Sequence, residues 1–193
     1  MMETASSRSE QIPLETEINR ATVSPAKLVP QGRFQKAPFA AESNSMKEDY
    51  AEQIAGFSLF EGLNSRETQA LIELGTIQHM APGEIAFLEG AAADFVFLIL
   101  EGEVEVFVTR RNGNAVLATQ GPGFIVGELA VFSGMPRAAS VRAVIPCTIL
   151  KWQAEAFRQM LVSKPVVCER VFRQSVCGLI EKEKSLVESL TRW

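Results

Sequence analysis

The sequence predicts a mainly β fold with flanking helices, built as an antiparallel barrel or jelly roll. Between Ile77 and Trp152, apolar residues occur in short runs separated by turn residues, which is the pattern of many short strands. On both sides of this region the apolar spacing becomes three or four residues, as in helices. A chain of 193 residues can bury about 70% of its unfolded surface, so one core forms without disulfides or metals.

The first 44 residues differ from the rest of the chain. They are rich in Ser, Thr, Pro and mixed charges, and they contain few large apolar side chains. Such a segment cannot bury enough apolar surface to offset the entropy lost on ordering. We therefore expect residues 1–44 to form a flexible N-terminal tail and residues 45–193 to form one domain. The alternative is a tail that folds on contact with a partner.

Two short helices are expected at the start of the domain. Ser45 and Glu48 fit a capping box, in which each side chain bonds a backbone amide at the other position. Asn64 and Glu67 fit a second cap, ahead of a helical stripe over residues 70–74.

The strands that follow are of two kinds. A continuous apolar run over residues 95–100 suits a strand buried on both faces, whereas alternation over residues 103–108 suits a half-exposed strand. Asn112-Gly113-Asn114 can supply the positive φ of a tight hairpin turn. Further strands are predicted over residues 85–88, 115–119, 141–145 and 148–152.

Helical spacing returns after Trp152, with one helix over residues 154–162 and another from Pro165 to the C-terminus, about residues 165–193. Pro165 suits the first helical position, where its missing N–H is not needed. The second helix carries a three-heptad apolar seam with one polar interruption. This seam packs on the protein's own barrel or, from Leu179 onward, joins two copies in a homodimer. Its members are Phe172, Val176, Leu179, Glu183, Leu186, Leu190 and Trp193.

Composition excludes several function classes. The net charge of −4 argues against a broad basic surface for nucleic acid, and the longest apolar run, residues 95–100, is too short to span a membrane. The N-terminus has no basic start followed by an apolar stretch, so no secretion signal is expected. The three cysteines fit no metal or redox spacing, and His79 is the only histidine. We therefore expect a cytoplasmic protein with no metal and no catalytic residues.

The segment from Gly123 to Val141 holds the charges that can bind a ligand. It contains one acid, Glu128, and one base, Arg137, among small and apolar residues. The planar guanidinium matches two oxygens of a phosphate, and the carboxylate can accept hydrogen bonds from sugar hydroxyls. Gly127 lets a ligand approach the backbone, and a short helix from Glu128 points its first amides at an anion. A structural ion pair is the alternative, and it would add little stability.

Two runs, Gly127-Glu128-Leu129-Ala130 and Pro136-Arg137-Ala138-Ala139-Ser140-Val141, resemble the phosphate-binding cassette of cyclic nucleotide-binding domains. The resemblance covers about residues 57–178, including Gly90, Asp94, residues 101–104 and Gly123. It implies an eight-stranded antiparallel β-roll or jelly roll with N-terminal helices and C-terminal hinge and lid helices. The ligand-binding residues that it implies are Gly127, Glu128, Leu129, Ala130, Arg137, Ala138, Ala139 and Ser140.

The resemblance also implies a role for each of these residues. Arg137 would pair with the cyclic phosphate, Glu128 would hold the ribose 2′-hydroxyl, and backbone amides near Ala130 and Ala138 would complete the phosphate cradle. Asp94 would orient the arginine from behind the site, and Ser140 would add a minor contact. Family members that favour cGMP often carry threonine directly after the arginine, so Ala138 favours cAMP, with cGMP as the alternative.

Other positions are less well defined by the resemblance. Phe124 stands where the family is usually acidic or polar, and we expect a local packing change there. The resemblance does not identify the residue that caps the base. The candidates are Phe172, Arg173, Ser175 and Trp193. Because the sequence ends in that helix, with no helix-turn-helix after it, we expect no DNA partner.

These features predict a cyclic nucleotide sensor. Ligand binding would draw in Arg137, shift Leu129 or Phe132 against Phe157 and Leu161, and move the final helix over the base toward an unidentified protein effector. The alternative is a structural or scaffolding module that docks into a larger assembly, in which the nucleotide is static or absent.

Overall fold

A computed structural model of the protein describes residues 44–111 and 113–191, with side chains at residues 50–111, 113–184 and 187. Residues 1–43 of the predicted tail and the side chains of the Ser45 cap therefore lie outside the described part, whereas Asn44 begins the first helix. The helices are α1 (Asn44–Gly56), α2 (Ser65–Glu73), α3 (Glu128–Ser133), α4 (Ala154–Ser163) and α5 (Pro165–Thr191). The strands are β1 (Thr76–Met80), β2 (Ile85–Phe87), β3 (Phe95–Glu101), β4 (Val104–Arg110), β5 (Gly113–Gln120), β6 (Ile125–Val126), β7 (Ser140–Ala143) and β8 (Cys147–Gln153).

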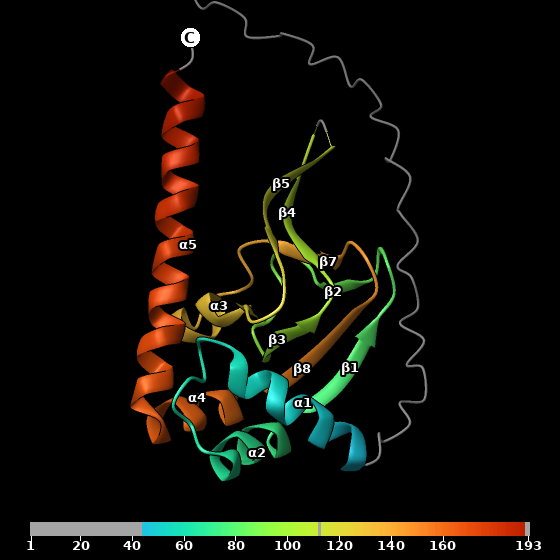
Figure 1. Ribbon diagram of the computed structural model, residues 1–193. Coiled ribbons are helices and arrows are strands. Elements are labelled where there is room, and N and C mark those ends of the chain that lie inside the picture. The colour runs from blue at the N-terminus through green and yellow to red at the C-terminus, as the bar shows by residue number, and fades with distance from the viewer. Residues whose placement is uncertain (1–43, 112, 192–193) are drawn as a thin grey trace, which may run out of the picture. The chain divides into compact units, whose positions relative to one another are not determined.

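The strands in the described residues form two antiparallel sheets of four (Figure 1). Their orders are β1-β8-β3-β6 and β2-β7-β4-β5. In the first sheet β3 lies between β8 and β6, with Leu98 opposite both Leu150 and Ile125. The predicted mainly β fold with flanking helices, and its eight-stranded roll, are thus confirmed.

The core has two parts, and β3 contributes to both. Val96, Leu98 and Leu100 pack with apolar residues of α1, α2, α4 and α5, whereas Phe97 and Ile99 pack with residues of β4, β6, β7 and β8. Because successive side chains of a strand point to opposite faces, the continuous apolar run is buried on both sides, as predicted. The helices are therefore anchored on the same strand whose other face fills the roll.

The second predicted cap is present and ties α2 to the C-terminal helices. Asn64 Oδ1 accepts a hydrogen bond from the Glu67 amide, and the Glu67 carboxylate accepts one from the Asn64 amide, each at 3.0 Å. Glu67 also pairs with Lys164, which directly precedes the start of α5 at Pro165. A capping box thus positions the junction from which α5 rises.

Two strand predictions need correction. A bulge between Val106 and Phe107 breaks the expected alternation in β4, so that Phe107 and Val108 are both buried. The strand predicted over residues 141–145 ends at Ala143, because the chain turns before Pro146, which has no N–H for a ladder.

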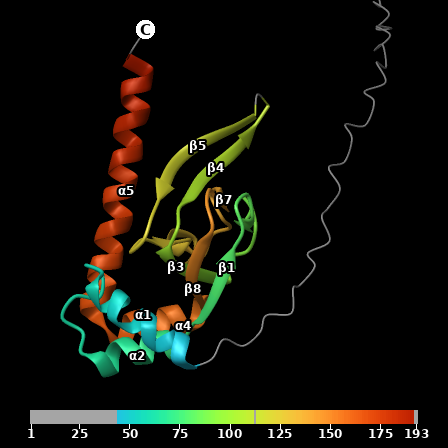
Figure 2. The same ribbon diagram turned by 45° about the vertical axis from the view of Figure 1, so that its right-hand side comes forward.

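The helix α5 stands beside the roll rather than beneath it (Figures 1 and 2). The helices α1, α2 and α4 gather at one end of the sheets, and α5 rises from that end past α3. The outer end of the predicted seam (Leu186, Leu190 and Trp193) falls outside the side chains that are described. Among the described residues, no helix has the length and apolar character needed to cross a membrane.

Candidate ligand-binding site

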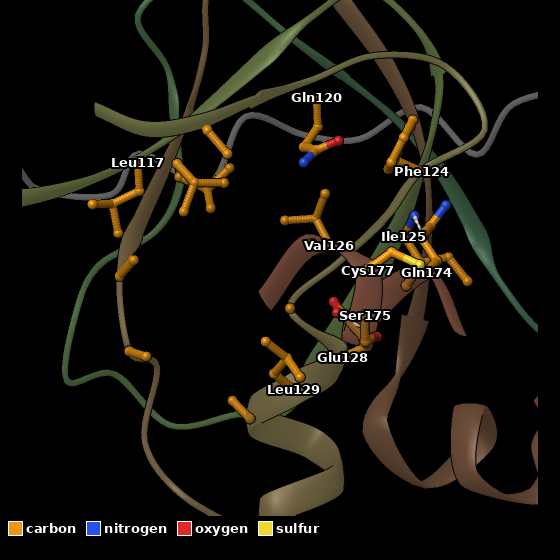
Figure 3. Close-up of a pocket in the computed structure, with 18 of the residues that line it drawn as sticks. Leu117, Gln120, Phe124, Ile125, Val126, Glu128, Leu129, Gln174, Ser175 and Cys177 are labelled. Atoms are coloured by element: carbon orange, nitrogen blue, oxygen red, sulfur yellow. Dashed lines mark hydrogen bonds between the residues drawn. The ribbon is translucent and has the colours of Figure 1, made fainter. Parts of the chain in front are cut away.

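A cavity of about 1320 Å³ lies between the β-roll and α5. Small-molecule sites usually measure about 300–1,000 Å³, so this one has room for a nucleotide. Figure 3 shows side chains from β5, β6, α3 and α5 around the same space. The cavity therefore brings the sequence-predicted cassette together with one face of the C-terminal helix.

The cassette helix α3 begins after a glycine that no other residue could replace without strain. Gly127 has φ +92°, in the left-handed region that favours glycine. A Cβ at this position would lie 2.6 Å from Arg137 Nη1. Gly127 is thus needed both for the turn into α3 and for the close approach of the Arg137 guanidinium.

Arg137 is the most deeply buried charge of the cassette, with 3% of its surface exposed. Its Nη1 donates to the Gly127 carbonyl at 2.7 Å and its Nη2 donates to the Phe95 carbonyl. Burial lowers the pKa of Arg137, and the charges of Asp94 and Glu128 partly oppose that shift. A guanidinium has five N–H donors. Two are used here, which leaves three, including a buried Nε–H that has no partner among the described residues.

Glu128 is also buried, with 9% of its surface exposed. Its carboxylate accepts a hydrogen bond from Ser175 Oγ at 2.8 Å, a contact between α3 and α5 (Figure 3). Burial raises the pKa of Glu128, and the bond from Ser175 lowers it in part. Ser175 Oγ also lies 2.9 Å from the Val171 carbonyl, so its single proton is shared between two acceptors.

A second α5 side chain holds the segment before the cassette. Gln174 Oε1 accepts a hydrogen bond from the Ile125 amide at 3.0 Å, next to the contact made by Ser175. From α4, Arg158 Nη2 donates to the Val131 carbonyl at 3.2 Å. The entrance to α3, its first residue and its middle are therefore each bonded to a C-terminal helix.

The structure places most of the predicted ligand-binding residues on the cavity wall. These are Gly127, Glu128, Leu129, Ala130, Arg137, Ala138 and Ala139. Ser140 does not line the cavity; its hydroxyl accepts a hydrogen bond from the Glu89 amide at 2.9 Å. Asp94 is exposed and acts on Arg137 through its charge.

The candidates for the base-capping position differ in whether they line the cavity. Arg173 and Ser175 line the cavity. Phe172 is 62% exposed and lines a different, apolar groove beside Leu129 and Phe132. Trp193 lies outside the described residues.

Several lining residues were missed by the sequence analysis. Phe124, for which only a packing change was expected, is 40% exposed and lines the cavity. The remaining ones from α5 are Arg170, Gln174, Cys177, Gly178, Glu181 and Lys182. Their spacing of three and four residues marks one helix face, and that periodicity could have identified them.

The comparison with protein families agrees with this geometry. Residues 77–164 match the family model described as the cyclic nucleotide-binding domain. This stretch of the chain is therefore similar to cyclic nucleotide-binding domains. Within the described residues, no three His, Cys, Asp or Glu side chains converge as a metal site would require.

Similar proteins carry this domain as part of longer chains. A cAMP-dependent protein kinase regulatory subunit from Yarrowia lipolytica is 28% identical over 120 residues, which are 62% of this chain and 31% of the relative. The chain spans less than half the length of the curated relatives it matches.

Two solved structures are similar to both the fold and the sequence. The catabolite activator protein of Thermus thermophilus has a TM-score of 0.59 and 26% identity, over 66% of this chain and 61% of that one. A cyclic nucleotide-binding domain from Methylobacillus flagellatus has a TM-score of 0.57 and 26% identity, over 73% and 80% of the two chains.

Proposed function

We propose that this protein is a non-catalytic cyclic nucleotide sensor of the cytoplasm, which prefers cAMP to cGMP and passes ligand binding on through its C-terminal helices. The observation that carries the proposal is Arg137, a buried guanidinium at the cavity wall with three N–H donors that no group in the described part of the chain accepts. A buried cation without a paired carboxylate costs free energy, and an anionic ligand removes that cost.

The phosphate and the sugar have separate partners in this proposal. Arg137 takes the cyclic phosphate through its free donors, because charge-assisted bonds to phosphate are strong and match its planar fork. Glu128 lines the same cavity and accepts the ribose 2′-hydroxyl. The small exposed side chain of Ala138 directly follows the arginine, and the family resemblance links that feature to cAMP.

The contacts between the cassette and α5 support the coupling step. The carboxylate of Glu128 would then bind the sugar hydroxyl while it accepts a hydrogen bond from Ser175 Oγ, so the ligand and α5 share one acceptor group. On the other side of α3, the ring of Phe132 lies 6.0 Å from that of Phe157 in α4. A shift of α3 therefore changes contacts with both C-terminal helices. The ligand stabilises whichever arrangement of these helices it binds more tightly.

The output partner is a protein effector or a second copy of the chain. Exposed apolar side chains on α5 favour such a contact, namely Val166, Phe172, Leu179 and Ile180. The same surface supports the competing scaffold function, in which partner binding does not depend on the nucleotide. A pull-down with and without saturating cAMP separates the two, because only a sensor changes its partner binding.

Calorimetry with cAMP and cGMP tests the sensor function directly. Replacing Arg137 with alanine removes charge-assisted hydrogen bonds of roughly 1.5–3 kcal/mol each, so cAMP affinity falls at least tenfold. Hydrogen exchange over residues 153–191 changes when cAMP is added. Unchanged affinity in the R137A variant contradicts the role given to Arg137, and unchanged exchange contradicts the coupling.

A further inference from the structure

We propose that Phe87, which ends β2, is a positioning residue for Arg137: its ring holds the buried guanidinium in place before a phosphate arrives. This inference rests on the proposed function, because it names the group that prepares the phosphate-binding arginine.

Hydrogen bonds alone do not compensate the burial of Arg137. Only the Gly127 and Phe95 carbonyls accept from the guanidinium, and the Nε–H has no partner among the described residues. Asp94 and Glu128 act on it through their charges. A buried cation with so few direct partners needs another source of stabilisation to stay in one orientation.

Two aromatic rings supply that stabilisation. The central carbon of the guanidinium, Cζ, lies 4.2 Å from the centre of the Phe87 ring and 5.0 Å from that of Phe95. The two rings meet edge to face, with centres 5.9 Å apart. Cation–π attraction strengthens when the cation is desolvated, which is the situation of Arg137. The rings therefore form a floor for the guanidinium, with one from each sheet.

Of the two rings, Phe87 contacts Arg137 through its side chain alone. The Phe95 ring also contacts the Lys151 ammonium at 3.9 Å, and the Phe95 bond to Arg137 comes from its backbone carbonyl. Phe87 has the shorter distance to Arg137 and lines the cavity. A Cβ at Gly127 would lie 3.3 Å from Phe87 Cε1, so ring, guanidinium and glycine pack closely together.

The same roll offers a matched control. Arg142 Cζ lies 4.9 Å from the centre of the Phe107 ring, a second arginine–phenylalanine pair between β7 and β4. Neither of these residues lines the cavity. Replacing Phe107 with leucine thus removes a contact of the same kind, from an arginine that is also ion-paired with Glu105, without touching Arg137.

The test measures binding of cAMP and of adenosine, which has no phosphate, to F87L, F87Y and F107L variants of the full chain. F87L loses the ring, so cAMP affinity falls about tenfold. F87Y keeps a ring and restores affinity to within about twofold of the original protein, and F107L leaves it unchanged. Adenosine affinity is the same in all variants, because Phe87 acts through the phosphate-binding arginine.

A second measurement needs no ligand. In an NMR spectrum, the Nε proton of Arg137 experiences the ring current of Phe87, and its shift changes in F87L but persists in F87Y. The proposal is overturned if F87L binds cAMP normally, or if adenosine affinity falls as much as cAMP affinity. If the unaltered protein binds no cyclic nucleotide, the proposed function fails, and the Nε shift alone then decides whether Phe87 holds the guanidinium.

Discussion

Replacing Gly127 with alanine tests the whole arrangement around Arg137. The new Cβ would meet Arg137 Nη1 at 2.6 Å, which is too close for any real contact, and Cζ at 3.3 Å, which is tighter than usual. The guanidinium is already confined by the Phe87 ring and by two carbonyl acceptors. Alanine therefore displaces Arg137 from its present position and adds backbone strain at φ +92°.

The effect of the G127A substitution has two causes, backbone strain and the clash with Arg137. A second glycine allows the two to be measured separately. A left-handed conformation costs an alanine about 1–2 kcal/mol, which in a domain of this size lowers Tm by about 2–8 °C. Gly134 closes the same helix at φ +68° and has open space around its Cβ position. The G134A variant thus carries the strain without the clash, and it serves as the control.

Thermal unfolding and calorimetry with cAMP distinguish the two glycines. G134A loses stability and keeps its cAMP affinity, whereas G127A loses stability and at least tenfold in affinity, since Arg137 no longer reaches the phosphate. The reasoning is refuted if G127A binds cAMP as tightly as G134A does.

Three further predictions concern Glu128, Ser175 and Asn64. Burial raises the pKa of Glu128 in the folded protein. The folded protein therefore loses stability as the pH rises from the pKa of Glu128 in the unfolded chain through its higher pKa in the folded chain. E128Q therefore raises Tm at neutral pH in the absence of ligand, by an amount that shrinks in acid, while it weakens cAMP binding; an equal Tm at pH 7 would contradict this. S175A removes a bond to a buried carboxylate, costs about 1–3 kcal/mol in the free energy of unfolding, and speeds amide exchange in α5 near residue 175. N64A removes the cap of α2, costs about 1 kcal/mol by denaturant unfolding, and leaves cAMP affinity unchanged; a loss of affinity would mean that α2 acts on the site.

The sequence predicts the roll and the cassette because both depend on local patterns. Apolar alternation, turn residues and the Asn64 cap are each read from a few neighbouring positions. The pairing of Glu128 and Arg137 in one apolar segment is equally local, and it indicates a ligand with a phosphate and a sugar.

The features that the sequence does not reveal depend on contacts between distant segments. Phe87 lies 50 positions before Arg137, and no periodicity connects a ring on β2 with a guanidinium after α3. The bulge at Val106 and Phe107 depends on the register of β4 against β5. Ser140 illustrates the same point, because its motif position suggested a ligand contact while its hydroxyl bonds the Glu89 amide across the sheet.

The length of α5 would amplify a rotation at its base. The helix runs without a break from Pro165 to Thr191, and about 24 Å of it, at 1.5 Å per residue, lies beyond Ser175. Rotation of this rod by about 10° around Ser175 would carry its tip through roughly 4 Å. If the proposed coupling rotates α5, the end of the helix therefore moves much further than the residues beside Glu128.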